Sequence, residues 1–219
     1  MHPRAPGRTK FTALGDAPRP GPLLEPAFFE RDALVVARAL LGAYLRRGPV
    51  ILRITEVEAY RWPDDSANHC RMGPTPRNAP MWGPPGRAYV YVCYGLHAML
   101  NLVTGAVGEG AAVLIRACEP VAGLRVIQER RGGRAGPILL TGPGKVGQAL
   151  ALNPSWSHHP VVRRGGLTCL EGPVVADDQI LVGPRVGIDY ASPADRAAPW
   201  RLAIAGTPWV SVRRGLHPP

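Results

Sequence analysis

Alternating hydrophobic and polar residues over 50–60, VILRITEVEAY, predict one long β-strand. Side chains two positions apart on a strand lie on the same face, so Glu56, Glu58 and Tyr60 are expected to lie together. A half-buried strand that only covers a core turns its carboxylates toward water. Nine residues after the tyrosine comes His69. The rest of the chain must show whether the two carboxylates face solvent or take part in chemistry.

The same periodicities predict the other elements. Residues 23–47 carry helix signals, with Glu30 and Asp32 placed to stabilise a helix N-terminus. The remaining expected elements are two β-like runs within 88–105, a strand from 111, helices over 121–131 and 144–152, and short β-like runs within 172–190 and 200–212. Strands dominate and no parallel strand–helix–strand unit is evident, so we predict an α+β fold. It is expected to be a single domain with a curved, largely antiparallel β-sheet, flanking helices and a protruding β-hairpin.

The length of the chain sets the domain organisation. A chain of 219 residues suits one domain with its own core, and 46% hydrophobic residues support a folded globule. Residues 1–22 are rich in Pro, Gly and Arg and lack the apolar core of a signal peptide, so we expect a disordered basic tail there. We predict that the folded domain covers 23–213 and that 214–219 form a C-terminal tail.

The charge balance narrows the choice of partner. Basic residues outnumber acidic ones by 26 to 16, which gives a net charge of +10. Such an excess favours a polyanionic partner. No apolar run approaches the roughly 18–20 residues of a membrane span, and the basic residues are scattered, so nucleic acid is favoured over a membrane.

The four cysteines form no C-x-x-C pair, which predicts free thiols and no zinc site. Free thiols are typical of a reducing compartment, so we expect a cytoplasmic, nucleoid-associated protein.

The turn between the two β-like runs of 88–105 has an unusual composition. Tight turns normally take polar residues, whereas Tyr94-Gly95-Leu96-His97 is apolar and aromatic. An apolar tip on a stiff ribbon resembles the wedge that DNA-distorting proteins insert between base steps. The alternative is a tip that folds back onto the core or enters an oligomer interface. Hairpin geometry alone slightly favours this alternative.

The strand before this turn places aromatic side chains on one face. Tyr89, Tyr91 and Cys93 alternate with small apolar residues, so they share that face. Aromatic residues on strands are usually core residues or cross-strand pairs. The other interpretation is a set of stacking walls for a flat nucleobase.

Two polar residues interrupt apolar strands. Asn101 lies within AMLNLV, and Arg116 lies within AAVLIRAC. A buried amide or guanidinium must be hydrogen-bonded or paired. A structural explanation is a backbone bond for Asn101 and an ion pair with Glu119 or Glu56 for Arg116. A functional explanation remains open for both.

A cluster of acidic residues and one histidine between positions 56 and 69 could instead supply the hard-metal ligands of a nuclease. Its members are Glu56, Glu58, Asp64, Asp65 and His69. The two aspartates directly follow a proline, so they look more like turn residues than ligands.

The sequence TGPGKVGQAL also matches G-x-G-x-x-G weakly, although no parallel unit contains it. A helix N-terminus that holds a phosphate is the simpler interpretation of that motif.

Seven segments in order resemble the alkyladenine (3-methyladenine) DNA glycosylase family. They are ITEVEAY, DSANHC, TPRNAPMW, AYVYVCYGLHAMLNLV, VLIRACEP, GPGKVGQALAL and PWV. The resemblance extends from about residue 24 to residue 212. It implies an enzyme that acts on double-stranded DNA containing damaged purines, that releases alkylated or deaminated purines, and that uses neither a metal nor an organic cofactor.

The resemblance also implies roles for individual residues. Glu58 matches the general base that activates a water molecule, and Arg116 matches the arginine that orders this water. Tyr60, His69 and Tyr91 match the walls around the flipped base, and Asn101 matches the residue that excludes the 2-amino group of guanine. The intercalating tip corresponds to Tyr94 together with Leu96 and His97. Contacts with the DNA backbone correspond to Thr75, Arg77, Met81 and Lys145.

The scarcity of lysine bears on the type of glycosylase. A glycosylase that also cuts the strand through a Schiff base needs an amine nucleophile. Only Lys10 and Lys145 offer such a side chain. We therefore predict a monofunctional enzyme that leaves an intact abasic strand and so initiates base excision repair. Separately, we expect a monomer. A noncatalytic nucleic-acid-binding module, using the basic surface and Tyr94, is the third interpretation beside the glycosylase and the nuclease.

Overall fold

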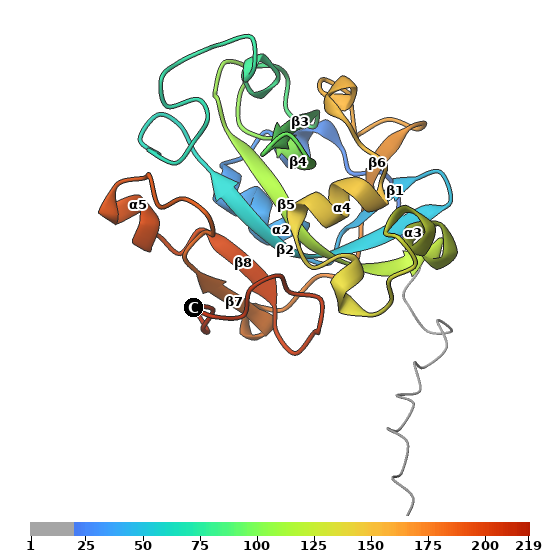
Figure 1. Cartoon of the computed structure of the whole chain (residues 1–219). Coiled ribbons are helices and arrows are strands. Elements are labelled where there is room, and N and C mark those ends of the chain that lie inside the picture. The colour runs from blue at the N-terminus through green and yellow to red at the C-terminus, as the bar shows by residue number, and fades with distance from the viewer. Residues whose placement is uncertain (1–19) are drawn as a thin grey trace, which may run out of the picture.

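The computed structural model describes residues 20–219, so residues 1–19 of the expected basic tail lie outside the described part of the chain. The described strands form one sheet in which neighbouring strands are antiparallel (Figure 1). These strands are β1 (Tyr44–Arg47), β2 (Val50–Tyr60), β3 (Ala88–Cys93), β4 (His97–Val103), β5 (Ala112–Ala122), β6 (Leu167–Leu170), β7 (Ile180–Gly183) and β8 (Arg201–Ile204).

The long strand β2 lies in the interior of this sheet. The strand order is β3-β4-β5-β2-β1-β6, and β8 pairs with both β2 and β7. The first half of β2 therefore borders β1, the second half borders β8, and β5 runs along the other side. Register shifts beside Glu56 mark irregular pairing between β2 and β5. The carboxylates predicted to share a face thus lie in the middle of a sheet and not at its edge.

Short helices flank the sheet. They are α1 (Pro26–Phe29), α2 (Ala33–Leu40), α3 (Leu124–Arg130), α4 (Pro143–Ala149) and α5 (Pro193–Ala197), with 3₁₀ helices at Ala79–Trp82, Pro137–Leu139, Pro154–Trp156 and Asp177–Gln179. In Figure 1, α4 crosses in front of β5 and α2 lies behind it, and both contact that strand. The predicted α+β fold with a largely antiparallel sheet is confirmed.

The stretch 23–47 is only partly helical, which corrects the sequence-based expectation. Asp32 does cap α2, because its carboxylate accepts from the backbone N–H of Leu34 at 2.8 Å. The helix ends before Gly42, which has a φ of +87°. Residues 44–47 then form β1, which pairs with β2 on one side and β6 on the other. Tertiary pairing thus overrides the helical periodicity of these four residues.

The described residues of both expected tails, 1–22 and 214–219, form backbone hydrogen bonds with the sheet or with residues next to it. The Gly21 N–H donates to the carbonyl of Glu171 at 2.9 Å, close to the start of the described chain. Near the other end, the backbones of His217 and Val182 exchange hydrogen bonds of 2.8 and 3.0 Å. Within residues 20–219, no helix combines the length and apolar character needed to cross a bilayer.

The glycines of the G-x-G-x-x-G match allow α4 to approach β4 closely. A Cβ added at Gly147 would lie 2.0 Å from the carbonyl oxygen of Ala98, and one added at Gly144 would lie 2.8 Å from Cβ of His97. Packing therefore accounts for these two glycines. The close approach also fixes the end of the hairpin of β3 and β4 that lies next to its tip.

We expect Gly147→Ala to destabilise the protein although alanine favours helices. The added methyl group collides with backbone that cannot rotate away, and such overpacking costs typically about 1–3 kcal/mol. The matched control is Gly83→Ala, because a Cβ there meets only the Pro80 carbonyl at 3.4 Å. Urea unfolding of the two variants checks this. Equal midpoints would contradict the proposed close packing of α4 on β4.

Candidate active site

The strand register places the predicted site residues in one row. Glu58 lies opposite Leu114 on β5, Leu114 lies opposite Asn101 on β4, and Asn101 lies opposite Tyr89 on β3. Directly opposed residues in antiparallel strands project their side chains to the same face. Arg116 lies two residues after Leu114 and so joins that face. Four strands therefore bring a carboxylate, a guanidinium, an amide and an aromatic ring to one side of the sheet.

Glu58 is completely buried and held by three donors. Its Oε1 accepts from the Val186 backbone N–H at 2.7 Å and lies 3.2 Å from a guanidinium nitrogen of Arg116. Its Oε2 accepts from the Tyr60 hydroxyl at 3.0 Å. These contacts fix the orientation of the carboxylate, and they link it directly to an aromatic residue that the sequence predicted as a wall of the base pocket.

Arg116 bridges the two carboxylates of β2. Its Nε lies 3.6 Å from Glu56 Oε1, and it donates to the Ser211 hydroxyl at 3.3 Å. Glu56 also accepts from Arg201 at 3.1 Å. Burial disfavours the charged guanidinium of Arg116, but the carboxylates of Glu58 and Glu56 outweigh this and raise its pKa. The pair with Glu56 expected from the sequence is present, and the contact with Glu58 comes in addition.

A cavity of about 390 Å³ opens on this face of the sheet. Its walls include Tyr60, His69, Tyr91 and Asn101, the four residues predicted to bind the base. The His69 and Tyr91 rings meet edge to face, with centroids 4.6 Å apart. The three aromatic residues are therefore gathered around one space that would hold a flat ring system.

Hydrogen bonds fix two of these walls. The His69 Nδ1 lies 3.1 Å from the hydroxyl of Tyr89, which also lines the cavity. The Asn101 amide nitrogen donates to the Tyr89 carbonyl at 3.2 Å. The backbone bond predicted as the structural explanation for Asn101 is thus present, and the same side chain lines the cavity.

The aromatic walls are electrically neutral near pH 7. Burial, followed by Arg77 and Arg71, lowers the pKa of His69 to about 4. Burial also raises the pKa of Tyr91, and it raises the pKa of Tyr60 well above its ordinary value. A neutral imidazole and two protonated phenols offer electron-rich faces without repelling a cation.

The hairpin between β3 and β4 carries its apolar tip into solvent. Tyr94 and Leu96 are 89% and 80% exposed. Tyr94 and Gly95 both have positive φ, at 51° and 68°, and the Leu96 N–H donates to the Cys93 carbonyl. His97 pairs with Cys93 at the start of β4. The alternative of a tip folded back onto the core is therefore wrong.

The residues predicted to contact DNA backbone lie in different settings. Thr75 and Arg77 line a second cavity of about 330 Å³ together with Arg71. This cavity adjoins the first, because four residues line both of them: His69, Arg77, Tyr89 and Tyr190. Met81 is only 3% exposed and lines the first cavity.

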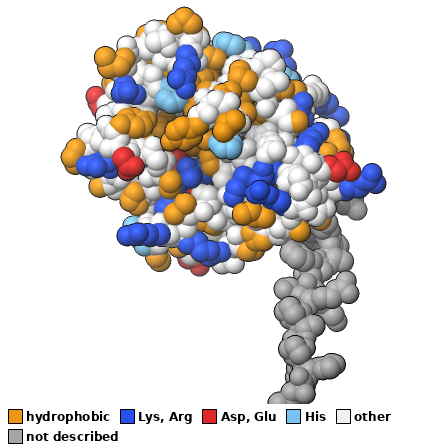
Figure 2. Space-filling view, viewed as in Figure 1, with side chains coloured by type: hydrophobic (Ala, Val, Ile, Leu, Met, Phe, Trp, Pro, Cys, Tyr) orange, Lys and Arg blue, Asp and Glu red, His pale blue; other side chains and the backbone are white. Residues whose placement is uncertain are grey.

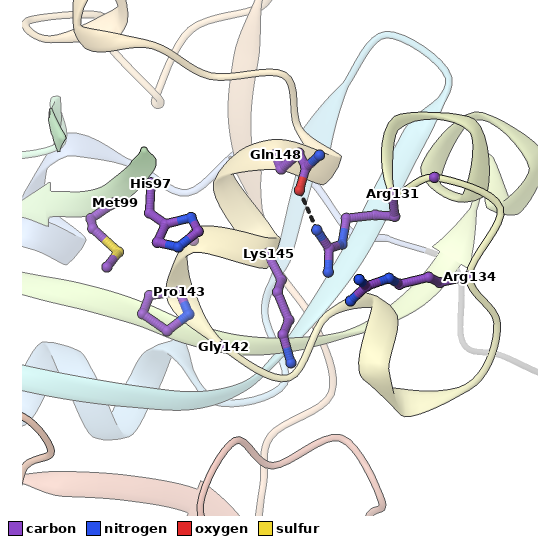
Figure 3. A pocket seen from close by; sticks show the side chains of 10 residues that line it. His97, Met99, Arg131, Arg134, Gly142, Pro143, Lys145 and Gln148 are labelled. Atoms are coloured by element: carbon purple, nitrogen blue, oxygen red, sulfur yellow. Dashed lines mark hydrogen bonds between the residues drawn. The ribbon is translucent and has the colours of Figure 1, made fainter. Parts of the chain in front are cut away.

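Lys145 lies in a third cavity, of about 620 Å³, beside the hairpin. Figure 3 shows Lys145, Arg131 and Arg134 extending into the same space, with His97 on the opposite wall. Burial, then Arg131 and Arg134, lower the pKa of Lys145. No carboxylate lines this cavity. Elsewhere on this face, Lys and Arg side chains are spread over the surface and Asp and Glu are sparse (Figure 2).

The acidic cluster does not form a metal site within residues 20–219. No group of three or more His, Cys, Asp or Glu side chains in this part of the chain is arranged to hold an ion. Glu56 and Glu58 face guanidinium groups, and Asp65 forms a buried ion pair with Arg185. Carboxylates engaged with arginine are poor candidates for cation ligands, which disfavours the nuclease interpretation.

Sequence reasoning did not find several residues of the site. Val186, Ile188 and Tyr190 line the cavity, although the pattern of their segment indicated only a short β-like run. Val186 acts through its backbone N–H, which leaves no signature in the side-chain pattern. Ser211 likewise meets Arg116 only through tertiary contact. The sole sequence signal near them is the polar Arg185 within an apolar run.

Comparison with known proteins agrees with this geometry. The sequence model of the methylpurine-DNA glycosylase family matches residues 27–208. A protein of Nitrosococcus oceani is 64% identical over 196 residues, which cover 90% of this chain and 96% of that protein. The DNA-3-methyladenine glycosylase of Arabidopsis thaliana is 58% identical over 198 residues, which cover 90% of this chain and 77% of that protein. The chain therefore belongs to the methylpurine-DNA glycosylase family.

The lowered pKa of His69 predicts acid sensitivity of the fold. Between the usual value of 6.5 and about 4, the unfolded chain binds a proton at His69 that the folded protein does not. Stability is therefore lost as the pH falls through this window, on the order of 1 kcal/mol per pH unit. We expect His69→Gln to flatten the pH dependence of the melting temperature. The exposed His158→Asn, as control, should keep the wild-type slope, and an unchanged slope in His69→Gln would refute the assignment.

Proposed function

We propose that this chain is a monofunctional alkylpurine-DNA glycosylase that flips a damaged purine into the 390 Å³ cavity and hydrolyses its N-glycosidic bond. The observation that carries the proposal is the contact of buried Glu58 with Tyr60, which joins a fixed carboxylate to an aromatic chamber. Family membership supports DNA as the substrate. We further propose that the enzyme acts as a monomer in the cytoplasm.

In the proposed reaction Glu58 acts as the general base. A water molecule attacks C1′ of the flipped nucleotide while the carboxylate takes its proton, and the C1′–N bond breaks with the electron pair leaving on the purine. Arg116 and the Val186 N–H both engage Oε1, whereas Oε2 accepts from the Tyr60 hydroxyl alone among the described side chains. This leaves Oε2 as the acceptor for the water.

The cavity walls would select the base by charge and shape. Tyr60, His69 and Tyr91 present neutral rings, and a cationic 3- or 7-alkylpurine gains about 0.5–2 kcal/mol against each suitably placed aromatic face. A cationic purine leaves as a neutral molecule and needs no added proton. Asn101 stands in the wall, where its fixed amide would exclude the 2-amino group of guanine.

Contacts outside the cavity would hold the distorted duplex. Tyr94, with Leu96 and His97 beside it, would fill the gap that the flipped nucleotide leaves. Two basic cavities are suited to phosphodiesters. One lies beside the hairpin and contains Lys145, and the other adjoins the base cavity and contains Thr75 and Arg77. These contacts carry no sequence information, as a repair enzyme that searches all DNA requires.

We expect Glu58→Gln to reduce base release by about 10²- to 10⁴-fold, the usual contribution of a general base. The isosteric amide keeps the shape of the site, so binding to lesion DNA should persist. Chromatography of bases freed from alkylated DNA in the presence of EDTA checks this, with the exposed Asp178→Asn as control. Release by Glu58→Gln at the wild-type rate would remove Glu58 from its role. Wild-type protein that frees no base but cuts DNA with added metal would favour the nuclease.

We expect Tyr94→Ala to weaken flipping and slow base release by roughly tenfold, because stacking on one aromatic side chain is worth about 1–3 kcal/mol. Fluorescence of 2-aminopurine placed beside the lesion reports the flipping step. The control is Val174→Ala, another highly exposed apolar side chain, 95% exposed and outside the site. Equal fluorescence and equal release in both variants would favour an oligomer contact for the hairpin tip.

A further inference from the structure

Asp65 and Arg185 form a buried ion pair that the proposed reaction does not use. Both side chains are fully shielded from solvent. The guanidinium donates to the two carboxylate oxygens at 2.6 and 2.7 Å, in the parallel geometry typical of a strong pair. Asp65 also accepts from the backbone N–H groups of Arg61 and Ala67, each at 3.0 Å. The carboxylate thus fixes the turn after β2, and through Arg185 it joins that turn to a distant segment.

Arg185 contacts the aromatic wall of the cavity. Its guanidinium carbon lies 4.7 Å from the ring centroid of Tyr60 and 4.8 Å from that of Trp200. It also donates to the Ala59 carbonyl at 3.0 Å, one residue before Tyr60. Because the guanidinium occupies one face of the Tyr60 ring, a purine can stack only on the other face. The ion pair therefore sets the plane of a ring that both lines the cavity and donates to Glu58.

The residue after Arg185 contacts the general base directly. Val186 donates its N–H to Glu58 Oε1 at 2.7 Å, through the peptide group that it shares with Arg185. Anchoring the Arg185 side chain therefore restricts the position of this donor. Through Tyr60 on one side and Val186 on the other, the Asp65–Arg185 pair acts on two of the three donors that hold the Glu58 carboxylate.

Stability alone is a weak reason for such a pair. Desolvation of two ions offsets most of their attraction, and well-packed neutral replacements of buried pairs are often as stable. Geometry explains the presence of a charged pair better, because two parallel hydrogen bonds fix both the distance between the guanidinium and the carboxylate and the plane of the guanidinium. An error of about 1 Å in the position of a reacting group can cost roughly 10²-fold in rate.

We propose that Asp65 and Arg185 are positioning residues for base excision, which hold the Tyr60 ring and the Val186 N–H in the places that orient Glu58. This inference rests on the proposed function. It gives Asp65 a second role beside that of fixing the turn after β2, and this role is not that of a metal ligand.

The test compares three variants in single-turnover base release at saturating enzyme. Arg185→Lys keeps the charge but loses the planar fork, and the double variant Asp65→Asn/Arg185→Met removes both charges without leaving one buried and unpaired. The control is Arg125→Lys, which changes an exposed arginine paired with Glu129 on the surface. Melting temperature and affinity for a duplex containing a tetrahydrofuran abasic analogue are measured on the same preparations.

We expect both site variants to release bases about 10- to 100-fold more slowly than wild type, the usual effect of changing a group that orients an active-site ligand. Affinity for the abasic duplex should change by less than about threefold, and the control should match wild type. A purely structural role would lower the melting temperature and the active fraction but not the rate constant of the folded enzyme.

Folded variants that release bases at the wild-type rate would overturn the positioning role alone. If neither variant folds, the pair is a stability element and the positioning role is likewise overturned. If wild-type protein frees no base in this assay, the proposed function fails, and the positioning role fails with it.

Discussion

The structure depends on the neutralisation of two carboxylates in the interior of a β-sheet. Glu56 and Glu58 lie on β2, between β5 and β8, and neither has any exposed surface. A buried carboxylate without partners is too costly to keep ionised. Arg116 on β5 and Arg201 on β8 supply the compensating charges from the two neighbouring strands. The sheet order, which places β2 between these strands, is therefore what makes it possible to bury two ionised carboxylates, one of them the proposed general base Glu58.

This requirement also organises the C-terminal part of the chain. Arg201 contacts Glu56 and donates to the carbonyls of Pro184, Val212 and Arg214. One guanidinium thus joins a strand carboxylate to the segment that enters the site and to the segment that ends the chain. A substitution at Glu56 would disturb groups that lie far from it in sequence. The guanidinium that holds Glu56 therefore also holds the C-terminal segment in place.

Local pattern was sufficient to predict the strands that carry side chains to the site. The boundaries of β2 and the hairpin of β3 and β4 follow from alternation over long runs, and the resemblance then marked Glu58. The pattern failed for 44–47, where pairing on both sides replaces a helix. It was also silent about Val186, which acts through its backbone, and it marked Arg185 only as a polar residue within an apolar run, because the partner of its ion pair is 120 residues distant in sequence. Such contacts have no local periodicity to detect.

The distribution of charge resolves a conflict between binding DNA and accepting a cationic base. A protein of net charge +10 attracts a polyanion, but a positive pocket would repel an alkylated purine. The arginines nearest to Glu58 and Tyr60 are each paired with a carboxylate, so these buried groups add no net positive charge beside the cavity. The cavity beside the hairpin is lined by Lys145, Arg131 and Arg134, and no carboxylate is among its lining residues. Arg77 is the one arginine or lysine among the residues that line the 390 Å³ cavity, and it also lines the second cavity, so its charge lies on the boundary that the two cavities share. Most other lining side chains are aromatic or apolar, so positive charge lies mainly where the phosphates of the proposed DNA substrate would bind.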